Sequence, residues 1–212
     1  MAIETEIKLA LPDGAETVAR RALDACAGSA GREIQLANVY YDTPDLALAR
    51  AKSAIRVRLA PQGWLQTFKT IGSADNGLHT RHEWELPVAG DALDIDALLA
   101  ACDVPAAAEA LRAAAPSLAA LFRTDFARTI WRVSRGGTTV EAALDLGEIV
   151  AEAQGENGVE TRRAPIREVE LELIDGDEAV LHTLAEELVA VVPGLAPDNQ
   201  SKAQRGYRLR AA

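Results

Sequence analysis

Charged and aliphatic residues alternate strictly in several short segments of the chain, beginning near its start. In residues 3–9, Glu4, Glu6 and Lys8 share one face of an extended segment, and aliphatic side chains share the other face. This period of two is typical of a β-strand with one polar face. It recurs along the chain and predicts strands at about 3–9, 35–41, 55–59, 64–70, 79–86, 122–134, 138–146 and 166–174.

Other segments place apolar residues at the spacing of an α-helix. Residues 13–27 and 177–191 each carry one apolar stripe, and shorter helical pieces are predicted at 46–51 and 201–210. The segments between strands are polar in two places, which predicts a hairpin loop at 72–77 and a flexible loop at 155–158.

An Ala- and Leu-rich stretch separates the fifth and sixth predicted strands. Residues 87–120 predict two or three helices that are broken at Pro105 and Pro116. The sequence shows neither an internal repeat nor a linker. We therefore expect a single domain over residues 1–212, with a helical insertion at about 90–120.

Each charged strand face, taken alone, is explained by a solvated sheet surface, because half-buried antiparallel strands also carry one polar face. The charged faces of all the strands, taken together, are not explained by a solvated sheet surface. The polar faces are rows of ionic residues of both signs with few Ser, Thr or Gln, and the amphipathic helices need an apolar surface to cover. The pattern predicts an α+β fold, mainly antiparallel β, in which eight strands close into a tunnel with a charged lumen and helices pack outside.

The composition limits the classes of protein to which the chain can belong. Hydrophobic residues make up 49% of its 212 residues, which is enough to build a core and argues against disorder. The formal net charge of −10 argues against a sequence-independent nucleic-acid-binding protein, since such proteins need an excess of Lys and Arg. The same net charge does not exclude a small polyanion as a ligand. The acidic and basic residues predicted to face the lumen, among them Arg132, nearly cancel one another, so most of the negative charge belongs to the outer surface.

The sequence also indicates the cellular compartment of the protein. No apolar stretch reaches the roughly 18 residues that a membrane span requires, and Glu4 and Glu6 stand where a secretory leader would be basic and apolar. We therefore expect a cytoplasmic protein without a membrane partner. Cys26 and Cys102 lie far apart in helical stretches, which predicts two buried, reduced thiols, and the three histidines lack the spacing of a zinc site.

The residue types on the inward faces indicate the chemistry of the lumen. Carboxylates at alternate positions of a strand are hard oxygen donors, which suit Mg²⁺ or Mn²⁺ better than zinc. Without a cation they would repel one another and raise each other's pKa. Basic side chains on the same faces can bind phosphate oxygens, and the two sets together describe a phosphoryl-transfer site. The basic set is Lys8, Arg56, Arg58, Lys69, Arg81, Arg128 and Lys202.

The order of these charged motifs resembles that of the CYTH domains, which belong to the triphosphate tunnel metalloenzyme superfamily. The N-terminal signature is ExExK, here Glu4-Thr5-Glu6-Ile7-Lys8. Alone this motif is weak, but the later motifs follow in the order of the family, and the resemblance covers residues 2–210. They are Tyr40-Tyr41-Asp42-Thr43-Pro44, the RxR of Arg56 and Arg58, Phe68-Lys69, the RxExE of Arg81, Glu83 and Glu85, Arg128, the ExxxD of Glu141 and Asp145, the ExExE of Glu168, Glu170 and Glu172, and Ser201-Lys202.

The resemblance implies a tunnel that binds a triphosphate group and a divalent metal, Mg²⁺ or Mn²⁺. It implies that Lys8, Glu4 and Glu6 are catalytic, and that Lys8 contacts phosphate and protonates the leaving group. Glu83, Glu85 and Glu141 either orient cations or water, or pair with neighbouring arginines. The implied metal ligands are Glu4, Glu6, Glu168 and Glu170, supported by Glu172 and Asp145. The implied phosphate ligands are Lys8, Arg56, Arg58, Lys69, Arg81, Arg128 and Lys202.

The fold hosts several activities, so the resemblance leaves the substrate open. We expect an inorganic triphosphatase that hydrolyses tripolyphosphate to pyrophosphate and phosphate, because the sequence looks most like the bacterial members with that activity. The alternatives are a thiamine triphosphatase, a class IV adenylate cyclase, and a polyphosphate- or nucleotide-binding module without turnover. The cyclases carry a His-Phe pair before ExExK that is lacking here. For an organic substrate, Trp64 or Trp84 is either a stacking residue or a packing residue.

Further expectations concern the partners of the domain. Many bacterial members continue into a helical CHAD domain, and we expect none in this chain, which ends at Ala212. The expected partner is a small-molecule triphosphate, with no nucleic acid and no membrane. Assembly into a homodimer stays open.

Overall fold

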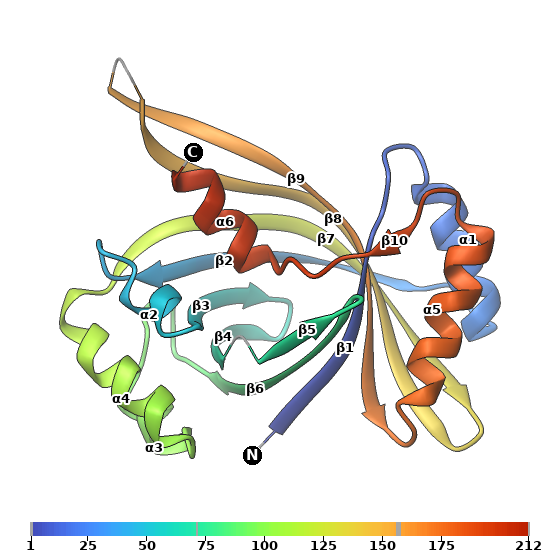
Figure 1. The fold of residues 1–212 in the computed structure, drawn as a ribbon, viewed down its shortest axis with the longest axis horizontal. Coiled ribbons are helices and arrows are strands. Elements are labelled where there is room, and N and C mark those ends of the chain that lie inside the picture. Colours follow the sequence, from blue (N-terminus) through green and yellow to red (C-terminus); the bar gives the residue numbers. More distant parts are fainter. Residues whose placement is uncertain (1, 71, 156–157, 212) are drawn as a thin grey trace.

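Eight antiparallel strands close on themselves in the computed structural model, which describes residues 2–70, 72–155 and 158–211 (Figure 1). The ring closes because β1 pairs with β9 along one edge and with β6 along the other. This confirms the predicted closed eight-stranded antiparallel barrel. In spatial order the strands are β1 (Ala2–Ala10), β9 (Gly158–Asp175), β8 (Thr138–Gly155), β7 (Ala119–Arg135), β2 (Arg32–Asp42), β3 (Ser53–Ala60), β4 (Gly63–Thr70) and β6 (Leu78–Pro87).

The strands extend further than the alternating pattern predicts. β8 and β9 have 18 residues each and project beyond the barrel as one long hairpin (Figure 1). The sequence prediction stopped at Leu146 because from Gly147 onward the inward face carries small and apolar residues in place of charges. Two residues of the predicted flexible loop, 156–157, lie outside the described part of the chain. The predicted polar loop at 72–77 contains a short strand, β5 (Ser73–Asp75), which pairs with β6, and β10 (Ala196–Pro197) pairs with β1.

Helices cover the outer face of the barrel in two places. α1 (Glu16–Ala27) and α5 (Ala179–Val191) pack over β1 and β7–β9, where aliphatic side chains such as Leu9, Leu144 and Val169 are buried. α2 (Ala47–Arg50), α3 (Ile95–Ala101) and α4 (Pro105–Ala114) cover β3, β4 and β6. The apolar face of these strands therefore points outward and their charged face points into the lumen, as the sequence predicts.

The last helix is placed differently. α6 (Lys202–Ala211) packs on the inward faces of β7–β9, against the cluster that contains Phe122, Phe126, Ile149 and Ile166. This differs from the expectation that every helix packs outside the barrel. The interior is consequently divided, since one part is charged and the other is an apolar core that α6 covers.

Local signals explain where the short helices begin. Pro105 occupies the start of α4, where its missing N–H costs no helical hydrogen bond. The Asp94 carboxylate accepts a hydrogen bond of 2.9 Å from the Ala97 N–H and caps α3. The buried Asp42 carboxylate accepts bonds from the Leu48 and Ala49 N–H groups at the start of α2. Within the described ranges no helix is long and apolar enough to cross a membrane.

Candidate functional site

The charged part of the barrel encloses a cavity of about 470 Å³. Among the described residues, seven acidic and seven basic side chains line it, so its formal charge is balanced. The acidic residues are Glu4, Glu6, Glu83, Glu85, Glu141, Glu170 and Glu172. The basic residues are Lys8, Arg56, Arg58, Lys69, Arg81, Arg128 and Lys202.

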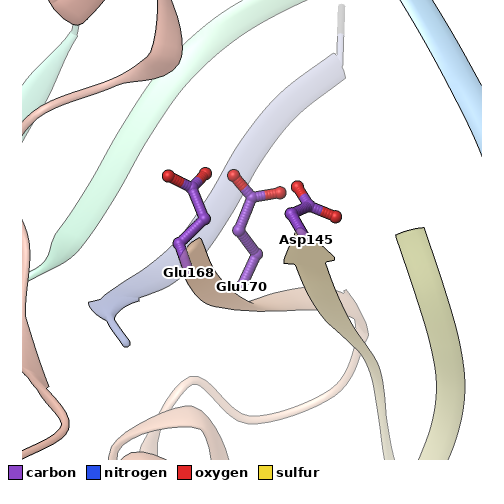
Figure 2. A group of neighbouring side chains, drawn as sticks. All are labelled: Asp145, Glu168 and Glu170. Carbon is purple, nitrogen blue, oxygen red and sulfur yellow. The ribbon is translucent and has the colours of Figure 1, made fainter. Parts of the chain in front are cut away.

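Among the described residues, three carboxylates of β8 and β9 form a compact acidic group, which we call the deep triad (Figure 2). Its members are Asp145, Glu168 and Glu170, and each offers an oxygen that lies within 4.8 Å of the others. Asp145 and Glu168 face each other across the β8–β9 pairing, and both are fully buried. Only Glu170 reaches the cavity wall.

Two lysines neutralise the deep triad from the cavity side. The Lys202 Nζ lies 2.5 Å from Asp145 Oδ2 and 3.0 Å from Glu170 Oε1, and it also bonds to Glu168. The Lys8 Nζ lies 2.8 Å from Glu168 Oε1 and also bonds to Glu170. Burial alone would lower the pKa of Lys8, but the Glu168 and Glu170 carboxylates raise this pKa above its usual value. Lys8 is therefore a permanent cation at neutral pH.

Two arginines complete the neutralisation. Arg128 makes a bidentate contact with Asp145, at 2.8 Å and 2.7 Å, and a further bond to Glu170. Arg205 of α6 bonds to Glu168 Oε2, whereas Lys8 bonds to Oε1 of the same carboxylate. Burial would raise the pKa of Asp145, but Arg128 and Lys202 hold this pKa below its usual value. Each carboxylate of the deep triad therefore bonds to at least two basic side chains of the protein.

A second acidic group, formed by Glu4, Glu6, Glu83 and Glu172, lies on β1, β6 and β9. Lys69 Nζ lies 3.0 Å from Glu4 and 2.6 Å from Glu83. Arg81 bonds to Glu4 through Nε at 2.5 Å and to Glu6 through Nη2 at 2.6 Å. Four carboxylates thus share two cations.

Glu172 is the uncompensated member of the second acidic group. Among the described residues it has no basic partner within 4.0 Å, and it faces Glu6 across the β1–β9 pairing. Burial, followed by the charges of Glu4 and Glu6, raises the pKa of Glu172 to about 7, although Lys69 acts in the opposite direction. Burial and Glu4 also raise the pKa of Glu83. The donor chemistry and the surplus negative charge of this group fit a hard divalent cation.

Surplus positive charge occurs at a pair of arginines on β3, Arg56 and Arg58. Arg56 donates to the Thr67 and Tyr40 hydroxyls at 3.3 Å each, and Arg58 Nε donates to Asn38 Oδ1 at 2.8 Å. Neither guanidinium has a carboxylate oxygen within 4.0 Å among the described residues. Burial, together with the charges of Arg56 and Arg128, lowers the pKa of Arg58 to about 10. The pair is a cationic wall whose charge fits an anion.

The structure places the sequence-predicted site residues in two layers. The cavity wall contains all the predicted phosphate ligands and four of the predicted metal ligands, namely Glu4, Glu6, Glu170 and Glu172. Asp145 and Glu168 lie behind Lys8 and Lys202 and do not reach the cavity.

Several other expectations fail or change in detail. Arg132, which was expected in the lumen, is exposed and lies outside the cavity lining. Neither Trp64 nor Trp84 lines the cavity, and Trp84 packs on Phe68 with ring centroids 5.6 Å apart. Both cysteines are free, as expected, but they are half-buried rather than buried.

Sequence reasoning missed several residues that contact the charged lumen network, among them Arg205 and Asn38. Arg205 follows Lys202 by three positions in a predicted helix, so the i,i+3 spacing was a usable signal that both face the deep triad. Asn38 was overlooked because the strand around it carries aliphatic and aromatic residues. The sequence signal that could have identified Asn38 was a single amide at an inward position of a strand. A polar group there needs a hydrogen-bond partner, because leaving it unsatisfied would be costly.

Solved structures share this fold. A putative adenylyl cyclase from Hippeastrum, described as having a dominant triphosphatase activity, superposes with a TM-score of 0.60 at 17% identity and covers 97% of this chain and 95% of its own. The PH1819 protein of Pyrococcus horikoshii superposes with a TM-score of 0.56 at 15% identity, over 97% of this chain and 98% of its own. At these identities the similarity establishes the fold alone.

Sequence similarity identifies the family. The inorganic triphosphatase of Haemophilus influenzae is 34% identical over 178 residues, which cover 82% of this chain but 46% of that protein. The matched part therefore spans less than half the length of that relative. The CYTH domain family matches residues 2–207, nearly the whole sequence. The chain belongs to the CYTH domain family.

Proposed function

We propose that the cavity binds inorganic triphosphate together with a divalent cation and hydrolyses the triphosphate to pyrophosphate and phosphate. The observation that carries this proposal is the charge separation within one cavity. An arginine pair that forms no ion pair with any described carboxylate lines one part, and a carboxylate group with surplus negative charge lines another. A phosphate chain that carries a metal ion satisfies both at once. The name of the Haemophilus relative supports the choice of an inorganic substrate.

The basic residues divide into two kinds of phosphate ligand. Within the described part of the chain, neither Arg56 nor Arg58 forms an ion pair with a carboxylate, so both bind phosphate oxygens without breaking an existing ion pair. The other basic residues must exchange their contacts with carboxylates for contacts with phosphate, and this exchange reduces the net free energy of binding. This second set is Lys8, Lys69, Arg81, Arg128 and Lys202.

The second acidic group and Glu170 hold the divalent cation, with Glu4, Glu6 and Glu172 as its nearest ligands. Mg²⁺ and Mn²⁺ both suit carboxylate oxygens. When bound, the metal supplies positive charge against the developing charge on the phosphoryl oxygens. Asp145 and Glu168 are saturated by basic side chains, so we assign them to orienting Lys8 and Lys202 rather than to first contact with the metal.

The reaction itself requires little covalent chemistry from the protein. The basic wall fixes the phosphate chain, and a carboxylate of the second acidic group orients a water for in-line attack on the terminal phosphorus. The raised pKa of Lys8 favours a fixed cation that stabilises charge on the leaving pyrophosphate, in place of the proton donor that the family resemblance implied.

Phosphate release from tripolyphosphate, ATP and thiamine triphosphate, each with Mg²⁺ and with Mn²⁺, tests the proposal. We expect tripolyphosphate to be the preferred substrate and activity to vanish with EDTA. Formation of cyclic AMP from ATP with tripolyphosphate untouched would contradict the proposal in favour of a cyclase. Tight binding without turnover of any substrate would contradict it in favour of a binding module.

A further inference from the structure

Asn38 is a buried amide that lies behind the cationic wall of the cavity. It is 1% exposed and is not part of the cavity lining. It lies on the inward face of β2, where it faces Arg58 of β3 on one side and Thr124 of β7 on the other. A buried amide is costly unless its oxygen and nitrogen are both hydrogen-bonded.

Both ends of this amide are used, and only one orientation of it satisfies its neighbours. Arg58 Nε donates to Asn38 Oδ1 at 2.8 Å. The Asn38 Nδ2 group donates to the Thr124 hydroxyl at 3.0 Å and lies 3.4 Å from the Thr124 carbonyl oxygen. A guanidinium can only donate and a carbonyl can only accept, so the amide oxygen must face Arg58. The guanidinium is therefore held by a fixed acceptor.

The acceptor is neutral, and this distinguishes Arg58 from most cations around the cavity. Five of the seven basic residues in the lining are bonded to carboxylates, which neutralise them. An aspartate at position 38 would have almost the same shape and would orient Arg58 equally well. It would also cancel the charge of this guanidinium. The neutral amide orients Arg58 without neutralising the positive charge of its guanidinium.

We propose that Asn38 is a positioning residue for phosphate binding: its side-chain oxygen aims the Arg58 guanidinium into the cavity while the full positive charge stays available to the substrate. Asn38 acts through Arg58 and does not itself contact the substrate. The inference rests on the proposed function, because it assumes that the anion in the cavity is a phosphate chain.

The substitution Asn38→Asp tests the charge argument. It keeps an acceptor for Arg58, and the Thr124 hydroxyl can turn to donate to the new carboxylate. We expect the Kd of metal-free tripolyphosphate, measured by calorimetry, to rise about tenfold or more, because a charge-assisted phosphate contact loses its charge. The KM for tripolyphosphate should rise with it, while kcat falls less.

Gln35→Glu is the matched control, since it adds the same charge to the exposed face of the same strand. This control should change neither the Kd nor the KM. A wild-type Kd and KM in Asn38→Asp would overturn the inference. If the wild-type protein neither binds nor hydrolyses tripolyphosphate, the proposed function fails, and the inference that rests on it fails with it.

A double-mutant cycle keeps the test decisive if Asn38→Asp does not fold. Asn38→Ala removes the acceptor, and we expect the KM to rise several-fold because Arg58 loses its fixed direction. In an Arg58→Met background, Asn38→Ala should leave the KM unchanged, since the residue it positions is gone. Equal effects of Asn38→Ala in both backgrounds, or a loss of thermal stability with an unchanged KM, would indicate a purely structural role and overturn the inference.

Discussion

Glu172 of β9 lies directly across from Glu6 of β1, and both side chains face the lumen. Arg81 bonds to Glu6 at 2.6 Å but not to Glu172, so the pair holds more negative charge than the protein neutralises. Buried carboxylates in this situation bind a proton or a metal ion. Metal binding and proton binding therefore compete at Glu172.

The first prediction is that stabilisation by Mn²⁺ increases with pH. The pKa of Glu172 is raised to about 7, so this carboxyl is protonated in the metal-free fold below that pH. The folded state then holds a proton that the unfolded chain releases at lower pH, so the stability of the metal-free protein falls as pH rises from the unfolded pKa towards 7. The shift in Tm on adding Mn²⁺ should be larger at pH 8 than at pH 6. In Glu172→Gln we expect a smaller shift that depends less on pH.

The second prediction concerns Glu6 itself. Glu6→Gln removes a proposed metal ligand while Arg81 keeps its contact with Glu4 at 2.5 Å, so the fold should survive. We expect kcat/KM for tripolyphosphate with Mg²⁺ to fall by about a hundredfold or more, as expected when transition-state charge stabilisation is lost. Glu186→Gln, an exposed change on α5, is the control and should have wild-type kinetics. Near wild-type activity in Glu6→Gln would rule out the metal assignment.

The third prediction separates the structural role of Lys8 from its catalytic role. Lys8→Met leaves Glu168 and Glu170 with one cation fewer in a buried network. Breaking a buried pair from one side costs about 3–5 kcal/mol, which urea unfolding would measure. Turnover of the protein that remains folded should fall more than its binding of tripolyphosphate. Arg112→Met, at an exposed position of α4, is the control, and a stability loss no larger than that of the control would contradict this account.

The alternating pattern was sufficient to predict the closed barrel, because most of the strands place charges on one face and apolar residues on the other. In β1, for example, Glu4 and Glu6 face the lumen while Leu9 is buried under α5. Periodicity could not predict the boundary between the charged part and the apolar part of the barrel interior. That boundary depends on α6, whose position is set by contacts between residues far apart in the sequence, such as Phe122 and Tyr207.

Residue types identified most of the charges of the lumen network, but not Arg205, and they could not pair the charges with one another. Asp145 and Glu172 are both inward carboxylates of neighbouring strands, and the sequence treats them alike. In the structure Asp145 receives two bonds from Arg128 and one from Lys202, whereas Glu172 faces other carboxylates. Their opposite pKa shifts follow from which cations reach across the lumen, and strand patterns do not contain that information.

The last prediction tests the seating of α6 over the apolar part of the interior. A Cβ at Gly206 would lie within 3.0 Å of ring atoms of Phe122, whose ring also stacks on Tyr40 with centroids 4.7 Å apart. Helix propensity alone predicts that Gly206→Ala stabilises α6 by up to about 1 kcal/mol. The close approach predicts the opposite sign, a loss of about 1–3 kcal/mol from overpacking.

Thermal unfolding distinguishes the two signs, and we expect the Tm of Gly206→Ala to fall by several degrees, at roughly 2–4 °C per kcal/mol for a chain of this length. Turnover should fall as well, because Lys202 begins the same helix and must keep its contacts with the deep triad. Phe122→Leu makes room for the new methyl group, so the double variant should lose less stability than the sum of the two single variants. An additive double variant, or a Tm that rises in Gly206→Ala, would show that α6 does not depend on this contact.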